Sequence, residues 1–512
     1  MKKKKILIVN CYFDELRIPI KRKAKMPQAM TPAFIAGVFS PALCEIKLYN
    51  EQYSGPLEDE KLLAWPDMLV LTGLNTSFDR MLHITAYTRT KNKQVIAVAG
   101  GPAIRALPQY SKRFFDYCCL GDIEQLREVI EDTFTKEYVS INFLEKGWVI
   151  PRYDLAYWTG IIGYVESSRN CYNSCNFCSL TGEGVKYRPY ELEYLRQQFI
   201  AMGRHKYIMF LDNNFGSPDR QFVVDRFELL RELWHKKYFK GWGALVSPDF
   251  FLNDDYLDLA RHAGGGLWFS GIESFDKKAL LNLKKHQNIG FNQLEIIRKC
   301  LLEGFTFYYG IVFDVSSRSI ADLREELEFI INNSEITLPC YISIAVPILG
   351  TPFFRECLEK GIILPNIKLR DMDSTTLTLK PHDHLYDVVQ FIRDIQDLSK
   401  YRKDMIRQSK DFFLRYRNNL SYLLMLLSLY NGFLLCTPKL ATAGSNISNI
   451  FSKNYKKPSR TFVGSTEPLD AVYTPAFRVD SAYEYYFTPT MLTDHDGNLS
   501  EVLHTDLLRI RS

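Results

Sequence analysis

The sequence predicts an α/β protein built from a Rossmann-like, doubly wound domain, a partial (β/α)6 TIM-type barrel and a small carboxyl-terminal α+β unit. Two series of short apolar runs, each separated by helix-length segments, indicate the first two parts. A chain of 512 residues is also too long for one ordinary core. We expect a first domain over 1–135, a linker over 136–160, a barrel over 161–395 and a carboxyl-terminal extension over 396–512.

The doubly wound domain is predicted from five apolar runs in the first part of the chain: KILIVN, CEIKLYNE, DMLVLTGLN, QVIAVAGGP and YCCLGD. Runs rich in Val, Ile and Leu that lie ten or more residues apart are typical of a parallel sheet with helices on both faces. A ligand of such a sheet binds beyond the carboxyl ends of the strands, where small residues let a large flat molecule approach. The candidates at these ends are Asn10, Thr72, Gly73, Gly100, Gly101 and Gly121.

Six further strand and helix units indicate the barrel. The strand-like runs are IIGYVESS, KYIMFLDNN, GWGALVSPD, GLWFSGIES, FTFYYGIVFD and CYISIAVPILG, and helical segments such as DRFELLRELW stand between them. The site of such a barrel lies at the carboxyl mouth of its strands. Aromatic residues near these strand ends, such as Trp242, Trp268 and Tyr309, can line a pocket, but core packing is the favoured interpretation.

The carboxyl-terminal extension begins with a basic helical stretch and ends in a hairpin-like turn at Asp496 and Gly497. Between them lies the apolar segment 420–436, which Ser, Tyr, Asn and Gly interrupt and which is short for a membrane span. A buried helix is the favoured interpretation. A helix lying on a membrane surface is the alternative.

The composition of the chain limits which cellular compartment and which classes of binding partner we expect. The chain has 64 basic and 59 acidic residues, and this net charge of +5 is too small to indicate a nucleic-acid partner. The opening MKKKK is followed at once by the strand-like ILIVN, with no secretion signal. Eleven scattered cysteines favour free thiols and a metal site over disulfides. We therefore expect a cytoplasmic protein that does not bind nucleic acid.

The segment SSRNCYNSCNFC groups three of these cysteines, Cys171, Cys175 and Cys178, directly after the first predicted barrel strand. Thiolates hold iron-sulfur clusters, and a cubane cluster with three cysteine ligands leaves one iron open to bind another molecule. A structural zinc site would need a fourth ligand, yet the next His is His205 and the next Cys is Cys300. The spacing therefore favours a 4Fe-4S cluster.

This cysteine spacing, with the aromatic Phe177 before the third thiol, resembles the signature of the radical S-adenosylmethionine (SAM) superfamily. The resemblance implies that the open iron chelates the amino and carboxylate groups of SAM. It also implies that one electron, supplied by a donor such as flavodoxin or ferredoxin, cleaves SAM to a 5'-deoxyadenosyl radical.

Other segments resemble SAM-contacting positions of this superfamily. By resemblance, Asp212 and Asn213 in IMFLDNNF would contact the methionine amino group, and Glu273 in SGIES would contact the ribose. GIVFD, with Asp314, and PILGTPFF, with Gly350, resemble the segments that meet the adenine. Helix capping is the alternative role for Asp212, Asn213 and Glu273.

Together with KYRP, these segments resemble most closely the subgroup that carries an amino-terminal cobalamin-binding domain. Its familiar Asp-x-His-x-x-Gly motif is absent: NCYFDELRIPIKR follows the first strand, and His83 is the only His before residue 150. GGP and CLGD, which contain Gly100, Gly101 and Gly121, resemble loops that enclose the nucleotide tail of cobalamin. Tight turns are the alternative explanation of these glycines.

The resemblance predicts a cobalamin-dependent methyltransferase that acts on an unactivated carbon of a small natural-product, lipid or pigment precursor. The alternative enzyme uses the same radical for a cyclisation, oxidation or rearrangement, with cobalamin in a non-methylating role or the first domain empty. A non-catalytic iron-sulfur protein is a third hypothesis, which the acidic Asp212 and Glu273 disfavour. Methylated product or cleavage of SAM would separate the three.

Overall fold

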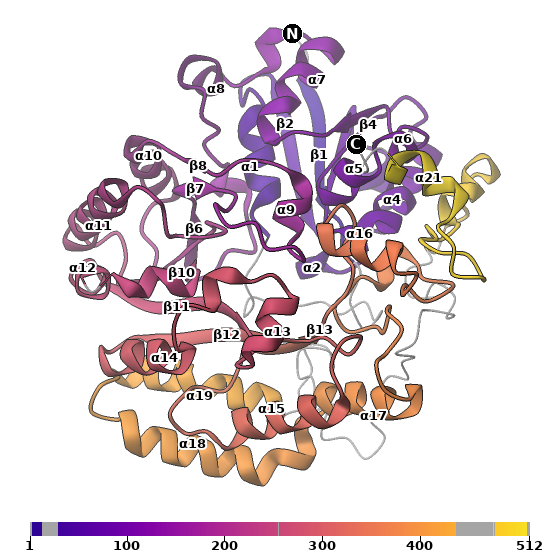
Figure 1. The fold of residues 1–512 in the computed structure, drawn as a ribbon. Coiled ribbons are helices and arrows are strands. Elements are labelled where there is room, and N and C mark those ends of the chain that lie inside the picture. The colour runs from indigo at the N-terminus through magenta and orange to yellow at the C-terminus, as the bar shows by residue number, and fades with distance from the viewer. Residues whose placement is uncertain (1–2, 13–28, 254, 437–474, 476, 509–512) are drawn as a thin grey trace, which may run out of the picture. The chain divides into compact units, whose positions relative to one another are not determined.

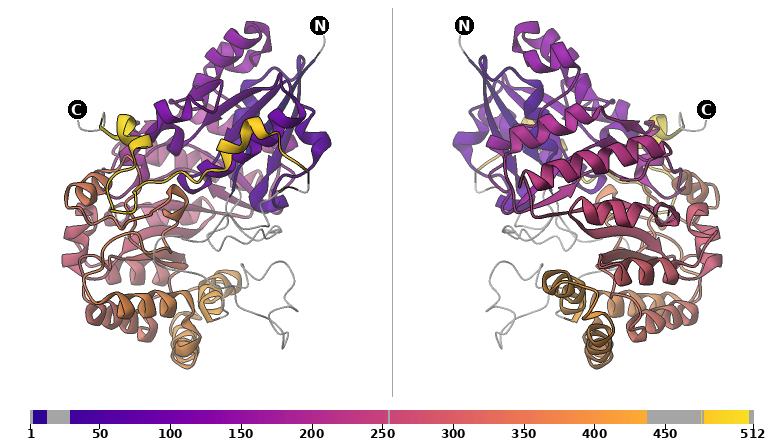
Figure 2. Two further views of the ribbon diagram at one scale, coloured as in Figure 1. Left: turned by 90° about the vertical axis from the view of Figure 1, so that its right-hand side faces the viewer. Right: turned by 90° about the vertical axis from the view of Figure 1, so that its left-hand side faces the viewer.

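A computed structural model describes residues 3–12, 29–253, 255–436, 475 and 477–508 (Figure 1). The polar region after 436 and the segment after the first strand, which the sequence analysis used, lie largely outside the described residues. Contacts divide the chain into two compact units. The first contains 1–160, 347–378 and 441–512, and the second contains 161–346 and 379–440. Each unit is described by itself, and Figure 2 gives two further views of its elements.

The first unit contains a fully parallel sheet of five strands in the order β2-β1-β3-β4-β5. All five strands predicted for the doubly wound domain are confirmed. The strands are β1 (Lys4–Asn10), β2 (Cys44–Asn50), β3 (Met68–Thr72), β4 (Ile96–Gly100) and β5 (Tyr117–Cys119). The helices that join them are α1 (Thr31–Val38), α2 (Glu51–Ser54), α3 (Glu60–Leu63), α4 (Phe78–Lys91), α5 (Pro102–Ala106), α6 (Pro108–Ser111) and α7 (Leu126–Thr133).

Burial explains the apolar runs of the first sheet. Every residue of β3 is buried, and so are Ile6 to Val9 of β1, because helices cover both faces of the central strands. The edge strand β2 instead alternates buried and exposed side chains. The order of the strands reverses between β1 and β3, and the carboxyl ends at that point form the crevice in which ligands of doubly wound sheets bind.

Three later segments pack on the first sheet's helices. The residues around α8 (Ile141–Lys146) run beside α1, where Phe39 pairs with Val139 and the Arg152 amide donates to the Ala33 carbonyl. The 3-10 helix η10 (Ser481–Phe487) packs on α4, and α21 (Glu501–Leu508) packs on α6. α16 (Pro352–Glu359) also belongs to this unit.

The second unit contains a parallel sheet of six strands in the order β13-β12-β11-β10-β9-β6, which is an open half barrel. All six predicted barrel strands are confirmed. They are β6 (Ile162–Val165), β9 (Tyr207–Phe210), β10 (Gly241–Val246), β11 (Gly265–Glu273), β12 (Thr306–Phe313) and β13 (Tyr341–Ile344). A short ribbon of β7 (Ser168–Arg169) and β8 (Arg188–Pro189) follows β6.

The helices of the second unit are α9 (Ser179–Glu183), α10 (Leu192–Met202), α11 (Arg220–His235), α12 (Tyr256–His262), α13 (Lys277–Asn282), α14 (Gln293–Leu302), α15 (Ile320–Asn332), α17 (Leu385–Gln396), α18 (Arg402–Tyr416) and α19 (Tyr422–Cys436). Aromatic rings fill the space between helices and strands: Trp268 is fully buried, and its ring packs against Trp242 and Phe250. Tyr309 is also fully buried. The aromatic residues at the strand ends are therefore core, as favoured.

The apolar segment 420–436 forms α19, which is buried on one side only. Met425 and Ser428 are buried, whereas Tyr422 is 81% exposed. No helix in the described part of the chain is both long and apolar enough to cross a membrane. Near the end of the chain, Thr493 pairs with Leu499 around a turn that contains Gly497 with a φ of +84°.

Candidate functional site

The three clustered thiols lie on one loop at the carboxyl end of β6, the first strand of the half barrel. The loop enters through β7, passes Cys171, Cys175 and Cys178, and leaves through α9. All three cysteines are half-buried and free. The Cys178 amide donates to the Cys175 carbonyl at 3.2 Å, which curls the loop back on itself. The sequence thus places three thiols at the mouth of a parallel sheet, where such barrels carry their sites.

Polar groups from two other segments contact these sulfur atoms. The Gln287 side-chain amide donates to Cys175 Sγ at 2.9 Å, and the Asn214 side-chain amide lies 3.7 Å from Cys171 Sγ. The Asn173 backbone amide donates to Cys171 Sγ at 3.4 Å. N–H donors aimed at sulfur stabilise a thiolate over a thiol.

The environment of the thiols suits a cationic cluster of several metal ions. Burial raises the pKa of Cys171 and raises that of Cys178 to about 11, and the neighbouring thiols add to both shifts. A bound metal offsets this cost because it deprotonates the thiols that coordinate it. Sulfur atoms around one tetrahedral zinc lie about 3.8 Å apart, given a Zn–S bond of about 2.3 Å. Within the described residues, only Asp494, His495 and Asp496 bring three ligand atoms within 4.8 Å of one another, so at least two of the three cysteine sulfur atoms lie farther apart than that.

Asp212, which follows β9, forms hydrogen bonds to the residues at the start of the cysteine loop. Its carboxylate accepts from the Ser167 amide at 2.8 Å and from the hydroxyls of Ser167 and Ser168, both at 2.6 Å. The Arg226 guanidinium lies 3.8 Å away, and the side chains of Asp212 and Arg226 are both fully buried. Burial raises the pKa of Asp212. These contacts give Asp212 a positioning role under the loop.

The next two residues continue this support. Asn213 is exposed, and its side-chain oxygen accepts from the Asn170 amide at 3.1 Å, just before Cys171. Asn170 has a φ of +64°, so this bond fixes a left-handed turn at the entry of the loop. Asn214 is buried and donates to the Ser247 hydroxyl at 2.9 Å as well as approaching Cys171 Sγ. The end of β9 thus contacts the cysteine loop at three successive residues.

Glu273 at the end of β11 forms a buried ion pair with Lys285. Lys285 Nζ lies 2.5 Å from Glu273 Oε1 and donates to the Gly271 carbonyl at 2.7 Å. A Cβ on Gly271 would come within 2.4 Å of that carboxylate and 2.7 Å of that ammonium, so only glycine leaves room for the pair. Lys285 also lies 5.8 Å from the centre of the Phe177 ring. Lys285 therefore links two residues predicted for the site: it pairs with the Glu273 carboxylate and lies near the Phe177 ring.

The backbone at Glu273 is held in an unusual conformation. Glu273 has a φ of +62°, and the register between β11 and β12 shifts between Gly271 and Glu273. This bulge turns the carboxylate out of the strand's regular alternation. The following residues are clamped, because Glu326 accepts from the Ser274 hydroxyl at 2.6 Å and from the Phe275 amide at 2.7 Å.

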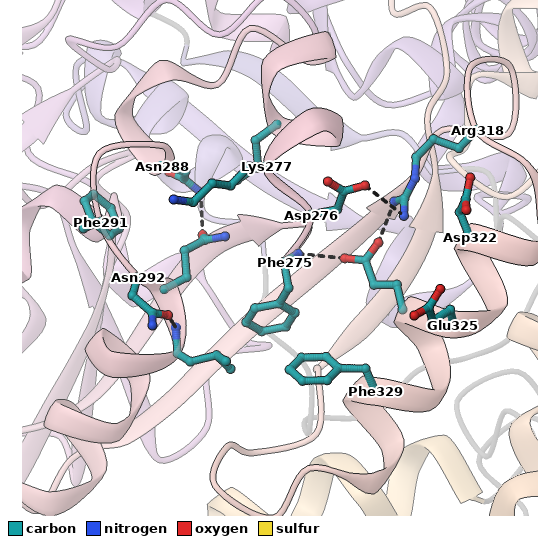
Figure 3. A pocket seen from close by; sticks show the side chains of 14 residues that line it. Phe275, Asp276, Lys277, Asn288, Phe291, Asn292, Arg318, Asp322, Glu325 and Phe329 are labelled. Atoms are coloured by element: carbon teal, nitrogen blue, oxygen red, sulfur yellow. Dashed lines mark hydrogen bonds and ion pairs between the residues drawn. The ribbon is translucent and has the colours of Figure 1, made fainter.

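Figure 3 shows the cavity on which this clamp borders. It has a volume of about 560 Å³, and Phe275, Asp276 and Phe329 contribute to its lining. Arg318 pairs with Glu326 at 2.5 Å, and both side chains are buried. The Asn288 amide donates to the Gly271 and Ile272 carbonyls from the neighbouring turn. These groups hold the end of β11.

The remaining predicted residues of the barrel are placed differently. Asp314, at the end of β12, accepts from the Ser316 amide and hydroxyl and from the Ser317 hydroxyl, so it stabilises its own turn. Gly350 has a φ of +81° and belongs to the first compact unit, shortly before α16. The structure therefore gathers Cys171, Cys175, Cys178, Phe177, Asp212, Asn213 and Glu273 at one end of the second unit.

In the first unit, the predicted residues lie at the carboxyl edge of the sheet. Asn10 and Thr72 are buried, and Asn10 donates to the side chain of Asn50 at 3.1 Å. Gly101 has a φ of +115°, and a Cβ there would come within 2.9 Å of the Gly73 carbonyl. The backbones of these two loops touch, which requires glycine at Gly101.

Gly100 and Gly121 complete this edge. Gly100 is half-buried beside Cys119, and Gly121 is exposed, donating from its amide to the Gln125 side chain at 2.6 Å. His83 lies elsewhere: it is buried in α4, and its ring stacks on Phe487 at 4.8 Å. Burial lowers the pKa of His83 well below 6.5. The edge therefore presents small residues and backbone groups, and His83 is a core residue.

Comparison with solved structures shows the fold. The cobalamin-dependent SAM radical enzyme OxsB matches with a TM-score of 0.56 and 16% identity, over 86% of this chain and 74% of OxsB. The radical SAM methyltransferase TsrM from Kitasatospora setae matches with a TM-score of 0.50 and 13% identity, over 72% of this chain and 78% of TsrM. No family model matches the sequence.

Two curated proteins match in sequence. The hopanoid C-2 methylase of Rhodopseudomonas palustris is 24% identical over 69% of this chain and 68% of its own length. The bacteriochlorophyllide d C-12(1)-methyltransferase of Chlorobaculum tepidum is 26% identical over 38% of this chain and 42% of its own length. The chain is thus similar in fold to cobalamin-dependent radical SAM enzymes and similar in sequence to two methyltransferases. Its doubly wound sheet and half barrel confirm the α/β fold class predicted from the sequence.

Three residues of the candidate site were not found from the sequence: Asn214, Lys285 and Gln287. Lys285 and Gln287 lie in the turn KKHQN after α13, more than 100 residues from the cysteine loop. No local sequence pattern marks these two residues, because the turn KKHQN comes near the cysteine loop only in the folded protein. Asn214 had a weak signal, since it directly follows the two residues predicted at the end of β9.

Proposed function

We propose that the protein is a radical SAM enzyme, a cobalamin-dependent methyltransferase that adds a methyl group to an unactivated carbon of a small natural-product, lipid or pigment precursor. The names of its two curated relatives support methyl transfer to carbon, on hopanoid and on bacteriochlorophyllide. The observation that carries the proposal is the loop of three thiols at the mouth of the half barrel, in a chain that also contains a doubly wound sheet.

In this proposal, Cys171, Cys175 and Cys178 hold a 4Fe-4S cluster, and the residues around Glu273 bind SAM. When bound, the cluster and SAM supply a carbon-centred radical, and cobalamin supplies the methyl group. The half-buried loop limits access of water, which protects a radical from quenching hydrogen donors. A small redox protein such as flavodoxin or ferredoxin supplies the electron.

The side chains divide into binding and positioning roles. Glu273 accepts from hydroxyl groups of the ribose, and the buried Lys285 fixes the direction of its carboxylate. Asn213, at the exposed end of β9, offers its side-chain amide to the methionine part of SAM. Asp212 orients the loop through Ser167 and Ser168. Asp314 and Gly350 are proposed at the adenine.

The first unit is proposed to hold cobalamin at the carboxyl edge of its sheet. Gly73, Gly100, Gly101 and Gly121 leave the loop backbones uncovered there, so that a large flat ligand can approach. With His83 buried in α4, no imidazole of the described first 150 residues is placed to replace the cofactor's own base on cobalt.

Metal analysis and product analysis together test the proposal. Protein purified without oxygen from cells supplied with cobalamin is expected to contain about four irons and one cobalt per chain. With a reductant and methyl-labelled SAM, it should release 5'-deoxyadenosine and transfer label to carbon in a lipid or pigment extract. Cys175→Ala should lose the iron and both activities, whereas Cys300→Ala, in the core of α14, should keep them.

Two results would contradict parts of this proposal. Release of 5'-deoxyadenosine without cobalt and without labelled product would replace methyl transfer with a radical cyclisation, oxidation or rearrangement. A full iron content without any cleavage of SAM would overturn the radical mechanism itself and favour a non-catalytic iron-sulfur protein.

A further inference from the structure

The helical pair α18 and α19 carries an unusual density of exposed apolar side chains. Of the 21 large apolar side chains that are strongly exposed among the described residues, seven lie between positions 406 and 430. They are Ile406 (58% exposed), Phe413 (43%), Leu414 (50%), Tyr422 (81%), Leu423 (40%), Leu426 (47%) and Tyr430 (42%). Single exposed apolar residues are ordinary, but such a concentration marks an interaction surface.

Helix α19 is turned with its polar side chains inward. Ser428 and Asn431 are each 2% exposed; the Asn431 amide donates to the Leu338 carbonyl at 3.2 Å, and the Ser428 hydroxyl donates to that of Thr306. Tyr422 and Leu426, four residues apart, lie on the free side. A surface helix of a globular protein normally has the opposite arrangement. Hydrogen bonds and the buried Met425 therefore attach α19 to the second unit, while Tyr422 and Leu426 remain open to another partner.

Helix α18 has a mixed apolar and basic outer stripe. Its inner side is fixed where Gln408 donates to the Ile336 carbonyl at 2.8 Å and Tyr416 donates to the Glu335 carbonyl at 2.7 Å. The outer side follows helical spacing and alternates in character. Its members are Ile406, Lys410, Phe413 and Arg417.

The charge of α18 is concentrated and largely unpaired. Residues 402–417 contain six basic and two acidic side chains, which nearly equals the net charge of +5 of the whole chain. Arg407 pairs with Asp404, and Arg415 approaches Glu335. Within the described residues no ion pair is found for the four other basic side chains. These are Arg402, Lys403, Lys410 and Arg417.

The two helices form one layer at the base of the half barrel. A Cβ on Gly432 of α19 would come within 3.2 Å of Ser409 Oγ of α18, so the helices pack closely. α19 attaches at Thr306, the first residue of β12, whereas the cysteine loop follows the carboxyl end of β6. Because the strands are parallel, the layer and the cysteine loop lie at opposite ends of the second unit. Figure 1 shows α18 and α19 side by side.

We propose that α18 and α19 form a docking face for the surface of an anionic lipid bilayer. Helices that lie in a bilayer interface bury Leu, Phe and Tyr at the acyl boundary while Lys and Arg reach the lipid phosphates. This face offers both kinds of side chain. A second copy of this chain is a poorer partner, because a two-fold contact would bring the unpaired cations of Lys410 and Arg417 against themselves.

Vesicle flotation with the full-length chain tests the proposal and requires no bound cofactor. The protein is expected to float with vesicles of phosphatidylcholine and phosphatidylglycerol, to float much less with phosphatidylcholine alone, and to be released by high salt. Lys410→Glu with Arg417→Glu should lower the partition coefficient by about tenfold or more, given the roughly fivefold gain expected from each basic residue at an anionic surface. Tyr422→Ser with Leu426→Ser should lower it to a similar degree.

Matched substitutions elsewhere on the second unit separate this face from general surface effects. Lys206→Glu with Lys240→Glu replaces two exposed basic residues, and Ile200→Ser with Leu281→Ser replaces two exposed apolar residues. Both control variants should leave flotation unchanged. Circular dichroism melting should be unaltered in every variant. Absence of flotation, or equal loss in the control variants, overturns the proposal. A dimer in light scattering that both face variants dissociate would assign the face to a second copy.

Discussion

The side-chain amide of Gln287 donates a hydrogen bond of 2.9 Å to the sulfur of Cys175. The bond joins the turn after α13 to the middle thiol of the cysteine loop. Donors to cluster sulfurs are among the factors that set the reduction potential of an iron-sulfur centre. Gln287 is therefore a positioning residue, and we expect it to influence the reduction potential at which the proposed cluster accepts an electron.

Gln287→Leu should make the cluster harder to reduce, because the reduced cluster carries more negative charge and loses a donor. A donor to a charged group contributes about 1.5–3 kcal/mol, so for this one-electron couple a shift of roughly 65–130 mV to lower potential is expected. A redox titration followed by electron paramagnetic resonance measures it. Gln221→Leu, which removes an exposed amide bonded to Asp225, is the control. An unchanged potential would show that Gln287 does not act on the bound cluster.

Substitutions in the Glu273 and Lys285 pair should have different effects on the stability of the protein and on its affinity for SAM. Glu273→Gln leaves Lys285 buried without its counter-charge, which should cost about 3–5 kcal/mol of unfolding free energy and weaken SAM binding by at least tenfold. Glu273→Leu with Lys285→Met should regain stability but not SAM affinity. Urea unfolding and equilibrium dialysis of reconstituted protein give the two values. Recovery of SAM binding in the double variant would refute a direct role for this carboxylate.

The pair of Asp212 and Arg226 should prove structural. Both side chains are fully buried, and burial lowers the pKa of Arg226 to about 10. Asp212→Asn removes the negative partner of a buried cation, so a loss of about 3 kcal/mol in unfolding free energy is expected. Because Ser167 and Ser168 would lose their acceptor, iron uptake in reconstitution should also fall. Asp225→Asn, on the exposed side of the same helix as Arg226, should change neither quantity.

His83 should make the first unit sensitive to acid. Its pKa in the folded chain lies well below 6.5, so the unfolded chain binds the proton more tightly. The folded state is therefore fully stable above pH 6.5 and loses up to about 1.4 kcal/mol per pH unit as the pH falls below that value. His83→Phe keeps the stacking on Phe487 and should remove this part of the pH dependence. Urea midpoints at neutral and mildly acidic pH compare the two proteins, and parallel curves would contradict the prediction.

The sequence was informative where the pattern is local and less so where contacts are distant. All eleven strands of the two sheets could be predicted, because the central parallel strands are apolar runs and the edge strand β2 alternates apolar and polar side chains. The cluster site at the three thiols was predicted from their spacing, and Glu273 was predicted from the resemblance of SGIES to a ribose-contacting segment at a strand end. Lys285 was not found, since its partner is defined by the bulge at the end of β11. The orientation of α19 also escaped prediction, because polarity alone would have placed Ser428 and Asn431 outward.

Glu273 also links two opposing energies. An L-residue with a φ of +62° stores roughly 1–2 kcal/mol that a glycine would not. Glu273→Gly alone would relax that backbone but leave Lys285 buried without its counter-charge, a loss of about 3–5 kcal/mol that outweighs the gain. Only a change that also replaces Lys285 with an apolar residue would release the stored energy. A library screened only for folding should therefore keep the carboxylate and the ammonium together or lose both together.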